Sequence, residues 1–448
     1  MNPDTNFVIS LFNIDASGIE SLVTRTTEDT VIYEISLKRK PLSCPYCNGP
    51  MIGHGHKTKK IDHPVLRNRK GLILYHANRY ICKRCGKTAF EDNPFSMPGF
   101  NSSTLLLQNA MQRLGNLNYT LDMISKELNI SPTQLNNYID SFITIPPRIL
   151  PESLGIDELH SNALSRKSAT YLCILVDNEH RCIYDILDSR SKYFLSTHFS
   201  NIPREERCRV KFVTIDMWEP YKDVAKTYFP NALIAVDPFH VVQHLYNDFE
   251  RLRISLMKQC DYNSNGYYLL KKWHWLLTKD NIDLDNDKVF NHRFGMALNR
   301  RDIRQLIFDT FPVISVAFEL KEFYKRFNRH ASYEEACEKF ADVRRYFADS
   351  GISEYDEFVG ILTNWQDEIL NSFRRPYDDR KLSNSFTENV NGKLRTYLDV
   401  SRGINNFPRF RKRVIFALDP KISYALTAKL HSEKRKGTPR GPYNKPKD

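Results

Sequence analysis

The alternation of apolar and polar positions changes character several times along the chain. Residues 31–37 alternate in places, as a strand with one buried face does, and they predict a strand near the N-terminus. Between about residues 101 and 146 the period becomes helical, because Leu121, Ile124 and Leu128 recur at spacings of three and four. The pattern predicts a helical segment that follows a strand-forming region.

A turn divides this helical segment into two helices. Ser131 and Pro132 predict an N-cap and a first helical position, and Leu135, Tyr138 and Ile139 give the second helix an apolar face. The other face carries polar side chains of the kind that reach base edges in a major groove, namely Thr133, Gln134, Asn136 and Asn137. This arrangement predicts a DNA-binding helix-turn-helix, and a helical hairpin that binds nothing is the alternative.

After Pro146-Pro147 the pattern is that of a sheet. Apolar runs predict five strands near residues 154–160, 170–176, 182–187, 210–215 and 232–236, with helices at 193–199 and 220–229. Three consecutive strands followed by helix, strand, helix and strand is the order expected of an RNase H-like mixed sheet. From residue 240 to about 372 the pattern is almost wholly helical, which indicates an inserted domain.

The length agrees with several modules. A chain of 448 residues exceeds one ordinary core, and its 41% hydrophobic and 26% charged residues are usual for folded protein. The predicted fold class is multidomain α/β, with an RNase H-like mixed-sheet catalytic domain interrupted by an all-helical insertion. The expected segments are an N-terminal strand region with a zinc-binding module (1–95), the helix-turn-helix (96–147), the first part of the catalytic core (148–242), the helical insertion (243–375), the second part of the core (376–420) and a basic tail (421–448).

The charge distribution favours a polyanionic partner. The chain has 65 Lys and Arg against 53 Asp and Glu, a net charge of +12 and a pI near 9.1. Residues 38–87 carry thirteen Lys or Arg and one acid, Asp62, and residues 401–418 carry five and none. No signal peptide or membrane span is recognisable, so we expect a cytoplasmic protein with no membrane partner. In a reducing compartment the nine cysteines are expected to be ligands or buried thiols.

Two C-x-x-C pairs lie within the first basic region. Cys44 and Cys47 form one pair and Cys82 and Cys85 the other, and Gly86 suits the tight turn that follows. Four thiolates at this spacing are typical of a structural Zn²⁺ site. Redox thiols are the alternative, and the histidines of this region are expected to lie on the surface rather than replace a cysteine: His54, His56, His63 and His76.

Three carboxylates are placed to converge beside the predicted sheet. Asp157 is expected to end the first strand and Asp216 ends the fourth, while Glu388 shares a helix face with Asn391 and Arg395 at spacings of three and seven. Two Mg²⁺ ions held by such carboxylates supply what phosphodiester cleavage needs. Asp237 is the main rival of Asp216, because it also follows a strand, but the fifth strand is expected to lie farther from the first. Asp237 and His240 are otherwise interpreted as supporting residues, as DNA contacts or as a helix cap.

Taken together, these motifs resemble the ISL3 family of insertion-sequence transposases over nearly the full length of the chain. The resemblance is carried by the cysteine pairs, the helix-turn-helix and several short segments, namely Gly155–Glu158, Thr214–Tyr221, Val236–Val242, Asn384–Asn391, Gly403–Phe407 and Arg411–Arg413. It departs from the family at residues 396–399, Thr-Tyr-Leu-Asp, where basic residues are usual.

The resemblance implies a DDE transposase whose Asp157, Asp216 and Glu388 act on the inverted repeats at the ends of its own element. We expect two Mg²⁺ or Mn²⁺ ions per active site, a structural Zn²⁺, and double-stranded DNA as partner, with at least a homodimer on DNA in a bacterial, nucleoid-associated setting. Phosphates are expected to be held by Arg395, Arg411, Lys412 and Arg413. A zinc and helix-turn-helix regulator with an inactive catalytic domain and a host nuclease are the alternatives.

Overall fold

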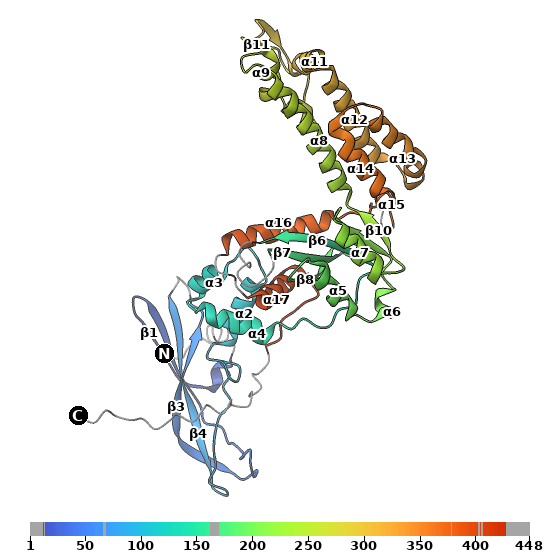
Figure 1. Ribbon diagram of the computed structural model, residues 1–448. Coiled ribbons are helices and arrows are strands. Elements are labelled where there is room, and N and C mark those ends of the chain that lie inside the picture. The colour runs from blue at the N-terminus through green and yellow to red at the C-terminus, as the bar shows by residue number, and fades with distance from the viewer. Residues whose placement is uncertain are drawn as a thin grey trace, which may run out of the picture. The chain divides into compact units, whose positions relative to one another are not determined.

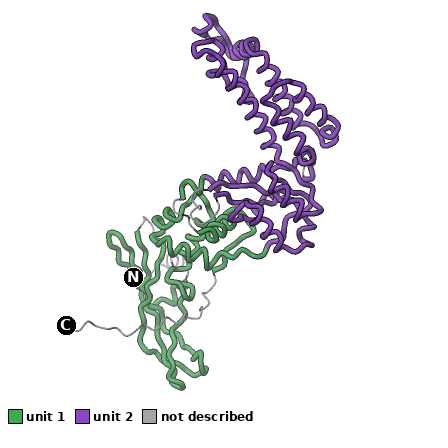
Figure 2. The backbone as a smooth tube through the Cα atoms, viewed as in Figure 1, with its two compact units in different colours: residues 1–147, 396–448 green, residues 148–395 purple. Residues whose placement is uncertain are grey.

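The structure is a computed structural model that describes residues 12, 14–65, 69–161, 170–377, 379–401, 404 and 406–426. The chain separates into two compact units, residues 1–147 with 396–448 and residues 148–395, shown in different colours in Figure 2. Most of the basic tail expected at 421–448 lies outside the described residues, as do Gly403 and Asn405.

The first unit contains a five-stranded sheet with the order β1-β2-β4-β3, and a short fifth strand pairs with β4. Strands β2 and β4 are parallel and the other pairs are antiparallel. The predicted strand at 31–37 is confirmed, whereas the long ribbon between the cysteine pairs was not predicted. The elements, including the 3-10 helix η1, are η1 (Ala16–Gly18), β1 (Ile19–Thr26), β2 (Thr30–Leu37), β3 (Met51–His63), β4 (Lys70–Cys82) and β5 (Thr88–Phe90).

Helices α2 (Thr104–Leu114), α3 (Leu121–Leu128), α4 (Pro132–Phe142) and α17 (Phe407–Leu418) complete the first unit. Asn129 ends α3 in the left-handed conformation, and Ser131 begins α4 with a capping box. Helix α17 contacts α4, and Arg409 forms an ion pair with Asp140 at 2.7 Å. This differs from the expected continuation of the catalytic core to residue 420, because the apolar side of α17 packs with α2–α4.

The second unit is built on a mixed sheet with the order β10-β9-β6-β7-β8. Strands β6, β7 and β8 are antiparallel neighbours, and β6, β9 and β10 run parallel. The five predicted strands are therefore confirmed, with helices between the later ones. The bounds are β6 (Ser153–His160), β7 (Tyr171–Asp177), β8 (Cys182–Leu187), α5 (Lys192–Ser200), α6 (Arg204–Arg207), β9 (Phe212–Ile215), α7 (Glu219–Tyr228) and β10 (Leu233–Val236).

A helical insertion follows β10, drawn in yellow-green to orange in Figure 1. Trp273 and Trp275 are partly buried against the hydrophobic core. The short hairpin β11–β12 was not predicted, because its three-residue strands have largely exposed side chains and no clear alternation. The bounds are α8 (Pro238–Gln259), α9 (Asn265–Lys272), α10 (Trp275–Thr278), β11 (Val289–Asn291), β12 (Met296–Leu298), α11 (Arg300–Thr310), α12 (Pro312–His330), α13 (Tyr333–Ala348), η2 (Ser353–Tyr355), α14 (Asp356–Asn364) and α15 (Gln366–Asn371).

Helix α16 (Ser385–Val400) comes after the insertion, and its first part belongs to the second unit. Within the described ranges, no helix combines the length and the apolar character that a crossing of a lipid bilayer requires.

Candidate active site and metal centres

The four predicted cysteines form one cluster in the first unit. Cys44 and Cys47 lie in the connection from β2 to β3, Cys82 ends β4, and Cys85 follows in the next turn. The Sγ atoms of Cys44 and Cys85 are 3.6 Å apart and those of Cys47 and Cys82 are 3.5 Å apart. A tetrahedron with Zn–S bonds of about 2.3 Å has sulfur atoms about 3.8 Å apart, so the spacing fits a Zn²⁺ ion.

Local backbone geometry prepares this cluster for a cation. Gly86 has a φ of +70°, which places the predicted tight turn in the left-handed region that glycine tolerates. Backbone N–H groups of Cys85 and Arg84 lower the pKa of Cys82 to about 6 and favour its thiolate. The cluster therefore offers four thiol ligands, one of them favoured as a thiolate, at a spacing that suits zinc.

The nearby histidines occupy varied environments. His54 and His56 are exposed as expected, and His76 pairs with Glu34 at 2.9 Å. His63 differs from the expectation of a surface position, because it is buried and its Nδ1 lies 2.9 Å from the Ser103 hydroxyl. No histidine belongs to the four-cysteine group found among the described residues.

The polar face of α4 is only partly exposed. Thr133 and Asn137 are exposed, whereas Gln134 completes the capping box and donates to Asp62 at 3.1 Å. Asn136 is half-buried and lines a cavity of about 450 Å³ with residues of α16 and α17. Of the four residues predicted to contact bases, only Thr133 and Asn137 are therefore exposed.

The basic residues of α17 also divide into two kinds. Arg413 is 2% exposed and donates to the carbonyls of Leu114 and Tyr119 and to the Tyr397 hydroxyl. Because a buried guanidinium must satisfy its donors internally, this residue fastens α17 within the unit rather than offering the phosphate contact expected from the sequence. Arg411 and Lys412 are half-buried, and Lys412 donates to the Asp140 carbonyl at 3.4 Å.

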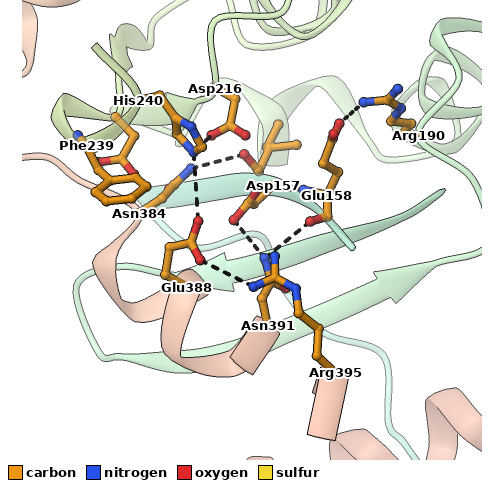
Figure 3. Close-up of polar contacts among 12 residues, drawn as sticks. Asp157, Glu158, Arg190, Asp216, Phe239, His240, Asn384, Glu388, Asn391 and Arg395 are labelled. Atoms are coloured by element: carbon orange, nitrogen blue, oxygen red, sulfur yellow. Dashed lines mark hydrogen bonds and ion pairs between the residues drawn. The ribbon is translucent and has the colours of Figure 1, made fainter. Parts of the chain in front are cut away.

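The second unit brings the three predicted acids to one place beside the mixed sheet (Figure 3). Asp216 directly follows β9, and Glu388 lies in the first turn of α16. Asp157 does not end its strand as expected but lies inside β6, opposite Ile174 of β7. The reason is that β6 pairs with β9 only as far as Gly155 but continues to pair with β7 as far as His160. Asp157 therefore lies beyond the end of the parallel pairing but within the antiparallel pairing.

Side-chain contacts join these acids to a histidine. His240, near the start of α8, places its Nε2 3.0 Å from Asp216 Oδ1 and 3.8 Å from Glu388 Oε1. Ligand atoms of Asp157, Asp216 and His240 all lie within 4.8 Å of one another. Asp237, the rival of Asp216, accepts from the N–H of Phe239 and caps α8. The sequence interpretation of His240 left its position open, and Figure 3 shows its ring between the two carboxylates.

Burial and mutual repulsion of the carboxylates determine the electrostatics of the site. Burial, together with the charges of Asp216 and Glu388, raises the pKa of Asp157 to about 9. Burial alone would lower the pKa of His240, but Asp216 and other nearby carboxylates raise it to about 9. Burial also raises the pKa of Asp237 to about 6. A buried carboxylate whose charge is disfavoured by neighbouring carboxylates is a group that a hard divalent cation would stabilise.

Two asparagines of the α16 segment hold the helix against β6. Asn391 donates to Asp157 Oδ2 at 2.9 Å and to the carbonyl of Glu158 at 3.3 Å. Asn384 donates to the carbonyl of Ile156 at 3.2 Å. A Cβ at Gly155 would lie 2.9 Å from Asn384 Oδ1 and 2.6 Å from a methyl group of Val176, so glycine permits this approach. The sequence analysis placed Asn391, but not Asn384, on the helix face of Glu388. It did not predict the hydrogen bonds of either asparagine to β6.

An arginine and aromatic rings border the site. The guanidinium of Arg190 forms an ion pair with Glu158 and lies 3.9 Å from the ring centroid of Tyr171 and 4.6 Å from that of Trp218. Trp218 is partly buried against the core. Arg395 is 54% exposed, and its Nη1 lies 3.9 Å from Glu388 Oε2. Of the four basic residues expected to hold phosphates, Arg395 is the one that lies beside Glu388 in the second unit.

Comparison with known proteins agrees with this geometry. The sequence model of the ISL3 family, described as Transposase, matches residues 154–414, which is more than half of the chain. The protein described as "Transposase for insertion sequence element IS1001" from Bordetella parapertussis is 24% identical over 248 residues, 54% of this chain and 55% of that protein. The chain thus spans about half the length of this relative. Because the family model matches more than half of the chain, the chain belongs to the ISL3 family of transposases.

Proposed function

We propose that the second unit is an RNase H-like catalytic core that cuts DNA and joins it to a target through Asp157, Asp216 and Glu388. The observation that carries this proposal is the convergence of these acids from β6, the end of β9 and α16 around His240. The strand order, with two antiparallel and two parallel pairings, supports the same fold assignment. Family membership supports DNA transfer as the reaction class.

The three acids would hold two Mg²⁺ or Mn²⁺ ions. Such ions supply neutralisation of phosphoryl charge and activation of an attacking hydroxyl. The chain's own residues would fix the donor oxygens, with Asn391 orienting Asp157 and His240 orienting Asp216. Arg395, exposed beside Glu388, would hold a phosphate of the bound strand.

The first unit would recognise the terminal inverted repeat. Its four cysteines would hold a structural Zn²⁺, and α4 would present Thr133 and Asn137 to base edges, with Gln134 and Asn136 partly engaged elsewhere. Since two element ends must be processed together, at least a homodimer is expected on DNA. The working place would be the bacterial cytoplasm at the nucleoid.

Divalent metal is expected to stabilise the second unit. A ligand present at about 100 times its Kd adds about 2.7 kcal/mol to the free energy of unfolding, or about 5–10 °C in Tm for a domain of this size. Differential scanning calorimetry with and without Mg²⁺ measures the shift. Asp157→Asn is the control and should show a much smaller shift, and an equal shift in both proteins would contradict this metal site.

The activity is tested with a labelled duplex that carries the DNA flanking its own gene, incubated with Mg²⁺ or Mn²⁺. We expect metal-dependent nicking at the repeat boundary and at least about a 100-fold lower rate for Glu388→Gln, because one charged metal ligand is lost. Specific binding without a cut by either protein would indicate the inactive regulator instead. Cleavage by Glu388→Gln at the wild-type rate would refute the assigned glutamate.

A further inference from the structure

The helical insertion contains a groove that the catalytic mechanism does not use. Its volume is about 330 Å³, and it lies among α10, the connection after it, α11 and α12. Helices α11 and α12 are neighbours in the insertion (Figure 1). We call it the insertion groove, and its lining is Leu276, Lys279, Asp280, Asn281, Ile282, Arg304, Phe318, Glu322, Lys325, Arg326 and Arg329.

The acids of the insertion groove are already neutralised from within. Lys325 forms ion pairs with Asp280 and, at 3.1 Å, with Glu322. Lys321, which is 1% exposed, donates to Glu322 at 2.7 Å and to the Leu277 carbonyl at 2.8 Å. Both carboxylates of the lining therefore form their close ion pairs with lysines. Their charge acts on Arg304 and Arg329 only from a longer distance.

Four other cations of the lining have no carboxylate within ion-pair distance among the residues that the structure describes: Lys279, Arg304, Arg326 and Arg329. Arg326 and Arg329 are exposed on α12, three residues apart and thus on adjacent positions of one helix face. Arg304 is held over the ring of Phe318 at 5.5 Å. Burial and the charge of Arg301 lower the pKa of Arg304, and the more distant charge of Glu322 offsets only part of this effect.

We propose that the insertion groove binds the phosphodiester backbone of duplex DNA. Arginine side chains match phosphate oxygens in geometry as well as charge, and Arg304, held over the ring of Phe318, is already positioned before binding, which lowers the entropy cost. The groove offers cations and few groups suited to base edges, so the contact is independent of base sequence. The identity of the ligand as DNA rests on the proposed function, whereas the site itself rests on the groove.

The test compares the full-length protein with Arg326→Glu/Arg329→Glu on two duplexes, one from the element end and one unrelated. Binding is measured without added divalent metal over about 50–300 mM salt. Loss of two phosphate contacts should reduce the slope of log K against log salt by about two and weaken binding roughly tenfold or more on both duplexes. Arg326→Lys/Arg329→Lys should keep most of the slope, since it keeps the charge.

The matched control is Lys258→Glu/Lys339→Glu, which makes the same change in charge at exposed positions of the insertion outside the groove. An unchanged slope in the groove variant, or an equal loss in the control, would overturn the proposal. Binding of inorganic phosphate in the groove without any effect on DNA would also overturn it. If the wild-type protein cuts DNA but the groove variant binds DNA normally, the groove proposal fails and the proposed function stands. If the wild-type protein does not cut DNA but the groove variant shows the reduced slope, the proposed function fails and the groove proposal stands.

Discussion

Replacing Asp157 with asparagine is expected to lower metal-dependent DNA cleavage by about 1000-fold without lowering the free energy of unfolding. The loss corresponds to about 4 kcal/mol of transition-state stabilisation, a usual contribution for bound metal ions. Stability is retained because Asp157 is 2% exposed and burial with two nearby acids raises its pKa to about 9. Asparagine resembles the protonated acid and removes the penalty for a buried, repelled carboxylate.

Cleavage of the labelled repeat duplex and calorimetric unfolding in the absence of divalent metal measure the two effects. Asp248→Asn is a suitable control, because Asp248 is also 2% exposed but pairs with Arg251 inside the insertion. It should cut normally. If Asp157→Asn cut at the wild-type rate, or if its free energy of unfolding fell by several kcal/mol, Asp157 would have a structural role instead.

Replacing Cys82 with serine is expected to abolish zinc binding and unfold the surrounding module. Structural Zn²⁺ contributes about 10–16 kcal/mol of apparent binding free energy in small zinc modules. The apolar cluster at this site is small, with Cys44, Cys47, Met51, Tyr80 and Cys82 among its few members, and cannot replace that contribution. Binding to the element end should fall with it, while the unfolding transition of the second unit should persist.

Zinc content by elemental analysis and limited proteolysis around residues 40–90 measure the outcome. Cys337→Ser removes an exposed cysteine of the insertion and serves as the matched control. Full zinc occupancy in Cys82→Ser, or protection from protease equal to that of the control, would show that the four cysteines do not form a structural metal site.

Much of the architecture followed from periodicity. The five strands of the mixed sheet were predicted because their apolar runs are bounded by turns and acids, and β2 was predicted from its alternation. The ribbon β3–β4 was not predicted, because apolar residues such as Leu72 and Leu74 also occupy the half-buried face of β4, so hydrophobicity does not alternate along it. The hairpin β11–β12 was not predicted, because strands of three residues are too short to show an alternation of apolar and polar positions.

The acidic residues of the candidate site were predicted from the sequence, but the hydrogen bonds that hold them in place were not. Asp216 was predicted from its place after an apolar strand and Glu388 from its helix face, whereas Asp157 was expected to end a strand and lies inside β6. The hydrogen bonds of Asn384 and Asn391 to β6 join segments about 230 residues apart, and no local pattern reveals such contacts. Arg413 was expected to contact phosphate because runs of basic residues are usually exposed. In the structure it is buried and donates to the carbonyl of Leu114.

The distance along the chain between the halves of the active site has a consequence for synthesis. Asn391 reaches Asp157 across 234 residues, with the whole helical insertion between them. At a translation rate of about 5–20 residues per second, the ribosome needs about 12–47 s to progress from one to the other. During that interval the nascent chain can pair β6 with β7 but has no glutamate at the site. The proposed catalytic site is therefore incomplete until residues 384–391 have been synthesised.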